Sequence, residues 1–167
     1  MSNISDSPLE AGGHIVRKAQ SILGSNLKQA LNSQGPEYAL DYCSTRAIAL
    51  TDSMGFVQNA MVKRVSDKNR NPENAASPDE LAYITATKEA LAKGLPAEPK
   101  LIAAEGSYIG YYPIMTNAMC LQCHGKPLED IEEKTYTKIG ELYPEDKAFA
   151  YKADELRGIW VVEMKSN

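Results

Sequence analysis

The chain has 167 residues, and its 18 Lys and Arg against 22 Asp and Glu give a formal charge of −4 at pH 7. This length predicts one compact domain with a sizeable core, and a hydrophobic content of 43% argues against intrinsic disorder. The mild acidity does not favour nucleic acid as a partner, and the lack of a long apolar run in the sequence argues against a membrane-spanning helix.

Two helices are expected at the start of the chain. Ser7-Pro8-Leu9-Glu10 is typical of a capping box, and apolar residues recur at helical spacing to about Ser33. Gly35-Pro36 interrupts this pattern, and a second helix begins at the proline. One apolar stripe runs along the second helix and turns Cys43 inward; its members are Leu40, Cys43, Ala47 and Leu50.

Strands and shorter helices are expected in the rest of the chain. A strand from Val57 to Val65 leads into a polar loop, and Ser77-Pro78-Asp79-Glu80 is a second capping box, opening a helix that ends at Lys93-Gly94. The remaining expected elements are strands at Lys100–Ala104 and Ser107–Met115, a helix at Ile131–Leu142 and a strand at Gly158–Met164. The pattern predicts an α/β (α+β) fold, with an N-terminal helix at 1–34 and a main body at 35–167 that together form one compact domain.

The three cysteines carry the strongest signal of function. Two of them lie in Cys120-Leu121-Gln122-Cys123-His124, the C-x-x-C-H pattern of c-type haem attachment. Each thiol can form a thioether with one haem vinyl group, and His124 then lies under the iron as its proximal ligand. A redox dithiol normally belongs to a thioredoxin-like unit, and a zinc site needs more ligands than Cys43 and His14 supply. The motif therefore predicts one covalently attached haem c.

Several residues could occupy the second axial position of the iron. Cys43 is favoured because its helical stripe turns it inward, while a buried inert thiol is the alternative for this residue. His14, an open site or a methionine are the other candidates, the methionines being Met54, Met61, Met115, Met119 and Met164. A thiolate at this position would stabilise ferric iron and lower the reduction potential, and reduction would let the thiol protonate and leave.

Further residues are candidates for contact with the cofactor. Arg64, Lys68 and Arg70 could pair with the haem propionates, although a solvated basic loop is an equally good interpretation. Aromatic side chains on the strands could line the pocket, or could equally be core residues; they are Tyr108, Tyr111, Tyr112 and Trp160.

Four sequence blocks carry a family resemblance: Tyr42-Cys43-Ser44, residues 65–74, Tyr112-Pro113-Ile114 leading into residues 120–125, and residues 156–161. The chain resembles the monohaem c-type proteins and sensor domains with a PAS-like fold that were first described structurally from a cyanobacterium. This resemblance implies a PAS-like antiparallel sheet behind long N-terminal helices, with Cys43 as the second axial ligand opposite His124. Many relatives have an Ala-Pro pair after this cysteine where Arg46-Ala47 stands here, so the helix is expected to be less bent.

Three classes of function follow. A haem-based redox or small-ligand sensor is favoured, a soluble electron-transfer protein is the alternative, and a peroxidase-like enzyme is least favoured. A sensor would need a separate signalling output module and could bind a diatomic gas, whereas a carrier would need a redox partner protein. Because haem c is normally attached outside the cytoplasm, a periplasmic or other extracytoplasmic location is expected, with the signal segment removed ahead of the polar start at Met1.

Overall fold

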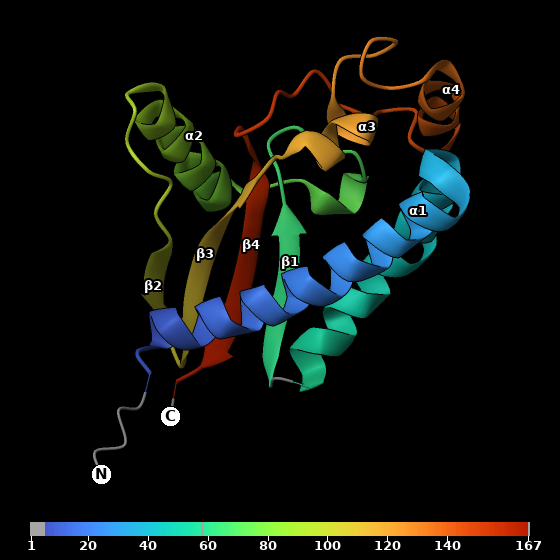
Figure 1. The fold of residues 1–167 in the computed structure, drawn as a ribbon. Helices are drawn as coiled ribbons and strands as arrows, with labels where there is room; N and C mark the ends of the chain where they lie inside the picture. The colour runs from blue at the N-terminus through green and yellow to red at the C-terminus, as the bar shows by residue number, and fades with distance from the viewer. Residues whose placement is uncertain (1–5, 58, 167) are drawn as a thin grey trace.

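The computed structural model describes residues 6–57 and 59–166, so the polar start at residues 1–5 lies outside the described residues. A four-stranded antiparallel sheet has the strand order β1-β4-β3-β2 (Figure 1). Its strands are β1 (Ala60–Val65), β2 (Lys100–Ala104), β3 (Ser107–Met115) and β4 (Leu156–Lys165). The helices are α1 (Pro8–Val57), α2 (Pro78–Ala92), α3 (Leu121–His124) and α4 (Glu133–Leu142), with short 3-10 turns at η1 (Pro72–Asn74) and η2 (Ala118–Cys120).

The long helix α1 consists of two limbs that meet at Gly35. This glycine has φ 81° and ψ −177°, a backbone conformation that favours glycine, and Pro36 follows it directly. The predicted interruption is therefore confirmed. The first limb crosses one face of the sheet, and the second limb returns toward β1 (Figure 1). The capping box is also present, because Glu10 accepts hydrogen bonds from the backbone and side chain of Ser7.

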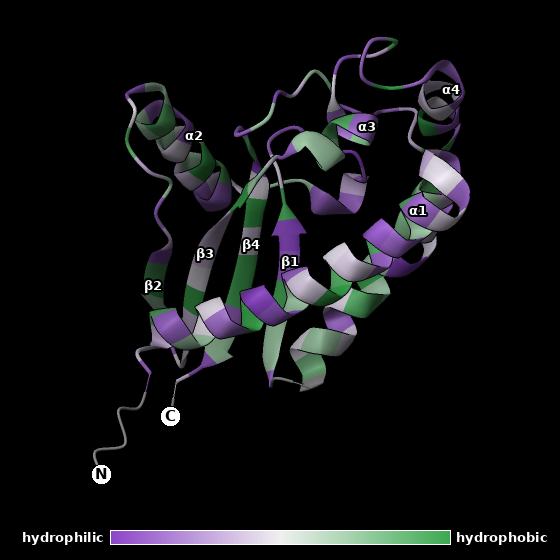
Figure 2. Ribbon diagram, viewed as in Figure 1, coloured by the Kyte–Doolittle hydropathy of each residue, from purple (hydrophilic) through white to green (hydrophobic). Residues whose placement is uncertain are grey.

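The two faces of the sheet bury different helices. On one face, the first limb of α1 packs Ile15 and Ala19 against Trp160 and Val162. On the other face, the sheet packs against α2, where Ser77 and Glu80 form the predicted capping box. Hydrophobic residues are concentrated along β4 between these layers (Figure 2). The alternation along the strands thus produces two cores, and the predicted α/β class with an antiparallel sheet is confirmed.

The expected elements differ from the observed ones mainly at their ends. The expected strand from Val57 is shorter, because the backbone stays helical through Val57 and β1 begins only at Ala60. A turn with Asn59 at φ 55° joins the two elements. Helix α4 begins at Glu133 rather than Ile131. The division into residues 1–34 and 35–167 stays a prediction, although the first limb of α1 shares one core with the sheet.

A third, smaller core positions the C-x-x-C-H segment. Leu40, on the second limb of α1, packs with Ile131 and Ile139, and Cys123 packs against this cluster. Lys138 on α4 also forms an ion pair of 2.5 Å with Asp41 on α1. These contacts hold the motif beside the second limb of α1. Along the described residues, no helix is both long and apolar enough to cross a membrane.

Gly158 on β4 lies very close to the backbone of the neighbouring strand β1. A Cβ atom on Gly158 would lie 2.5 Å from the carbonyl oxygen of Val65, whereas a Cβ on Gly24 in α1 would meet nothing within 4 Å. We expect Gly158→Ala to lower the free energy of unfolding by about 1–3 kcal/mol through overpacking. The matched variant Gly24→Ala should raise it by about 0.5–1 kcal/mol through helix propensity. Urea denaturation measures both, and equal effects of the two variants would contradict the close approach.

Candidate functional site

The C-x-x-C-H motif lies on η2 and α3, which follow β3 in the chain. Asn117 caps this turn by accepting a hydrogen bond of 3.2 Å from the backbone of Cys120. The chain then turns at Gly125, where a Cβ would lie 2.6 Å from the carbonyl oxygen of Leu121. Cys120 and Cys123 are both free thiols. A short helix therefore presents two unpaired thiols and an imidazole within five residues.

The ring of His124 is fixed by a backbone carbonyl. Its Nδ1 lies 2.8 Å from the carbonyl oxygen of Ala148. A carbonyl can only accept, so Nδ1 carries the proton and Nε2 keeps a free lone pair. Burial, together with the charges of Arg157, Arg70 and Arg64, holds the pKa of His124 well below its usual value. The imidazole is therefore neutral and able to bind a metal through Nε2.

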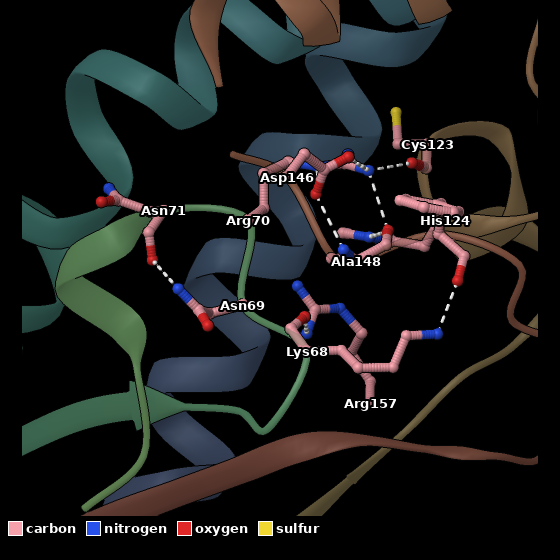
Figure 3. Close-up of polar contacts among 10 residues, drawn as sticks. Lys68, Asn69, Arg70, Asn71, Cys123, His124, Asp146, Ala148 and Arg157 are labelled. Carbon is pink, nitrogen blue, oxygen red and sulfur yellow. Dashed lines mark hydrogen bonds and ion pairs between the residues drawn. The ribbon is translucent and has the colours of Figure 1, made fainter. Parts of the chain in front are cut away.

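The guanidinium of Arg70 joins the motif to the loop that carries Ala148 (Figure 3). It forms a bidentate ion pair with Asp146, with both nitrogen-to-oxygen distances at 3.1 Å. Its Nη2 also donates to the carbonyl oxygens of Cys123, at 2.6 Å, and Ala148, at 2.8 Å. The side chains of Arg70 and Asp146 are 8% and 9% exposed, so water does not compete for these bonds. The bonds of Arg70 thus go to the protein itself, and its contact with a cofactor stays a prediction.

Cys43 comes to this region from the second limb of α1. It is a free, partly buried thiol. Burial raises its pKa, and the charges of Arg64 and Arg70 oppose that rise. Cys43 in turn acts on the pKa of Cys123, which burial raises to about 11. Cys43, Arg64, Arg70 and Cys123 are therefore close enough for their charges to influence one another.

The other candidate axial ligands lie in different surroundings. His14 is on the first limb of α1, where Arg17 lies 2.7 Å from its Nδ1 and Asp6 lies 3.3 Å from its Nε2. Met61 is 70% exposed, and Met54 is buried in the core between α1 and the sheet.

Three cations lie over aromatic rings. Arg64 lies over the ring of Trp160, 5.5 Å from its centroid, and Arg157 lies at the same distance from the ring of Tyr151. Lys68 lies 4.4 Å from the centroid of Tyr151. Burial lowers the pKa of both Arg64 and Arg157, and within residues 6–57 and 59–166 neither forms an ion pair. Because these partly buried charges lack a carboxylate partner there, the guanidinium groups are suited to an anionic one.

Two of the four aromatic candidates from the strands, Trp160 and Tyr112, lie in the same core but differ in their polar contacts. Trp160 is buried beside Arg64, and its Nε1 has no hydrogen-bond partner in the described part of the chain. Tyr112 is opposite Trp160 in the strand register, but its hydroxyl donates to the carbonyl oxygen of Leu9, at 2.7 Å, at the start of α1. Burial raises the pKa of Tyr112 to about 12. Its polar atom is therefore occupied by α1, and its part in a haem pocket stays a prediction.

Three further residues of the site were not among the candidates from the sequence: Ala148, Tyr151 and Arg157. Ala148 binds His124, and Tyr151 packs edge-on against the imidazole with ring centroids 6.4 Å apart. The Tyr151 hydroxyl is buried and without a hydrogen-bond partner among the described residues. Arg157, the third, lies in a block that carried the family resemblance, which is the one signal that could have identified it.

The donor set at this site fits a covalently attached haem. Cys120 and Cys123 are free to form thioethers, and His124 offers one neutral nitrogen. Arg64 and Arg157 supply partly buried positive charge, which suits a group that carries two propionates. In the described part of the chain, no group of three or more His, Cys, Asp or Glu side chains could hold a metal ion. One imidazole and one thiol suit a metal whose remaining ligands come from a macrocycle.

Two comparisons with known proteins, one of sequence and one of structure, both lead to Tll0287. The sequence profile of the Tll0287-like family matches residues 5–165. The crystal structure of the cyanobacterial heme-protein Tll0287 superposes with a TM-score of 0.71 at 17% sequence identity, covering 97% of this chain and 98% of that one. No curated protein matches the chain.

The partly buried, neutral imidazole makes a pH dependence of stability testable in the haem-free chain. His124 stays neutral in the folded state, whereas in the unfolded state it takes up a proton below about pH 6.5. The unfolded state then binds more protons, so the free energy of unfolding should fall as pH decreases from about 6.5 to 5.5, by at most about 1.4 kcal/mol per pH unit. Urea denaturation at these pH values measures the slope. His14→Gln should leave it in place, and a slope that vanishes in this control would contradict its assignment to His124.

Proposed function

We infer that this chain, which belongs to the Tll0287-like family, binds one haem c and works as a redox or small-ligand sensor. Cys120 and Cys123 would hold the haem covalently, and His124 would be the proximal ligand of its iron. When bound, the haem supplies one-electron chemistry and an iron position that can exchange ligands. The observation that carries the proposal is the bond from His124 Nδ1 to Ala148, which leaves Nε2 free beside two unpaired thiols.

The charge of the pocket supports the same cofactor. Arg64 and Arg157 are partly buried guanidinium groups that form no ion pair within the described residues. Each can bind a carboxylate through two parallel hydrogen bonds, so we assign the two propionates to these residues. Trp160 and Tyr151 would lie beside them, since Trp160 packs on Arg64 and Tyr151 on Arg157. Each contributes a buried polar atom that still lacks a partner in the described part of the chain.

Cys43 is the proposed second axial ligand. Its thiol must lose a proton to bind iron, and the positive charges of ferric iron, Arg64 and Arg70 all favour the thiolate. Burial acts in the opposite direction and raises the pKa of the same thiol. A lower charge on the metal would therefore shift Cys43 back toward its neutral form. This balance supports a sensor whose switch is the protonation and release of Cys43.

Electron transfer is the second candidate function. The motif lies near the surface, because Gln122 between the two cysteines is exposed and Cys120 is partly exposed. A haem edge held there would be accessible to a redox partner protein. A sensor would instead act on a separate signalling output module. For either function we propose a periplasmic or other extracytoplasmic location, since haem c is attached outside the cytoplasm.

Covalent attachment is tested on the two thiols of the motif. We expect Cys120→Ser and Cys123→Ser each to lose one thioether, and the double variant to lose covalent haem completely. The measurement is haem staining of a denaturing gel, after export of the protein into a compartment with haem c maturation. Cys43→Ser is the matched control, because its thiol lies outside the motif, and it should stain like the unchanged protein. Haem that stays covalently bound in the double variant would contradict the proposal.

The role of Cys43 is tested by spectroscopy of both oxidation states. In the ferric protein we expect a low-spin electron paramagnetic resonance signal of the thiolate type, and Cys43→Ser should lose it. In the reduced protein, release of the thiol should allow rapid binding of carbon monoxide. A thiolate signal that survives in Cys43→Ser would rule out this ligand. Slow carbon monoxide binding, with six ligands kept in both oxidation states, would favour the electron carrier.

A further inference from the structure

The carbonyl oxygen of Ala148 accepts two hydrogen bonds. One comes from His124 Nδ1 and the other from Arg70 Nη2, and both distances are 2.8 Å (Figure 3). The first donor is the neutral imidazole, and the second is a guanidinium that carries a full positive charge. Among the described residues, the imidazole therefore shares its only hydrogen-bond partner with a cation.

The peptide of Ala148 is held from both ends by the same ion pair. Arg70 donates to its carbonyl oxygen, and its N–H donates to Asp146 Oδ1 at 2.8 Å. Asp146 in turn holds Arg70 by two bonds of 3.1 Å, and Arg70 also donates to the carbonyl of Cys123. Both charged side chains are more than nine-tenths buried. The guanidinium is consequently fixed between two carbonyl groups. One is that of Ala148, which also accepts from His124, and the other is that of Cys123, the residue before His124.

We propose that Arg70 is a positioning residue that sets the electron-donor strength of His124 by sharing the carbonyl of Ala148. The proposal rests on the proposed function, because it concerns His124 as an iron ligand. A strong hydrogen bond from Nδ1 gives an imidazole more electron density and makes it a better ligand for ferric iron. A charged donor at the same carbonyl draws electron density from it and weakens the bond from His124. Arg70 thus limits the donation from His124.

The sharing has a consequence for the redox behaviour. An anionic ligand at Cys43 stabilises ferric iron and lowers the reduction potential. A weaker donor at His124 acts in the opposite direction. The two axial ligands therefore have opposite effects on the reduction potential. The potential stays higher than it would be if His124 alone used the carbonyl of Ala148.

The test removes the ion pair without changing the net charge of the pocket. The double variant Arg70→Met, Asp146→Asn loses one positive and one negative charge together and leaves the Ala148 carbonyl to His124 alone. The reduced protein saturated with carbon monoxide is diamagnetic, so the Nδ1 proton of His124 can be observed by NMR with 15N-labelled histidine. The chain has two histidines, and His14→Gln identifies the other signal.

A matched control removes a different ion pair. Lys88 and Asp67 form a pair of 2.5 Å that does not contact Ala148. The double variant Lys88→Met, Asp67→Asn is also neutral in net charge, and it should leave the Nδ1 signal and the midpoint potential in place. Arg70→Lys keeps the charge but lacks the planar fork, so it provides the same comparison if the Arg70 and Asp146 double variant does not fold.

We expect the Nδ1 proton to shift downfield and the midpoint potential to fall in the Arg70 and Asp146 double variant, with a smaller change of the same sign in Arg70→Lys. An unchanged Nδ1 signal in a variant that stains for covalent haem would overturn this inference and leave the proposed function intact. Equal shifts of the Nδ1 signal and the midpoint potential in the control variant Lys88→Met, Asp67→Asn would also overturn it. A wild-type protein without covalent haem would overturn the proposed function and this inference together.

Discussion

The buried ion pair between Arg70 and Asp146 is the interaction on which the site depends. Two opposite charges removed from water gain stability only when their remaining hydrogen bonds are satisfied. Here Arg70 also donates to two carbonyl oxygens, and Asp146 also accepts from the backbone of Ala148. The pair therefore joins the loop after β1, the C-x-x-C-H motif and the loop before β4. Without it, no charged side chain of the described residues would hold the peptide of Ala148, the acceptor of His124, in place.

The sheet and α1 supply the frame around this pair. The second limb of α1 carries Cys43, and the break at Gly35 lets that limb return toward β1 rather than continue past the sheet. Leu40 anchors the limb in the small core beside Cys123. Strand β1 presents Arg64, and β4 presents Trp160 directly opposite in the register. Rigid elements thus place the thiol and the cation, while loops supply the hydrogen bonds that orient His124.

The electrostatics of the pocket favour a neutral imidazole and an anionic partner. Burial and three arginines act together to lower the pKa of His124. For Cys43 the two effects are opposed, since burial raises the pKa of its thiol and Arg64 and Arg70 lower it. The imidazole is consequently fixed in its metal-binding form, whereas the thiol can respond to the charge beside it. This difference between the two residues is what makes a switch at Cys43 physically reasonable.

The sequence by itself determined the features that depend on near neighbours in the chain. The thiols and imidazole of residues 120–124 lie on the consecutive elements η2 and α3, the capping boxes begin α1 and α2, and the period of the strands separates two cores. Only the tertiary structure decided the partners of His124 and Arg70. Ala148 follows His124 by 24 residues, in a loop without periodicity, and Asp146 is 76 residues from Arg70. The packing of α4, β1 and β4 brings these groups together, and no local pattern encodes such a contact.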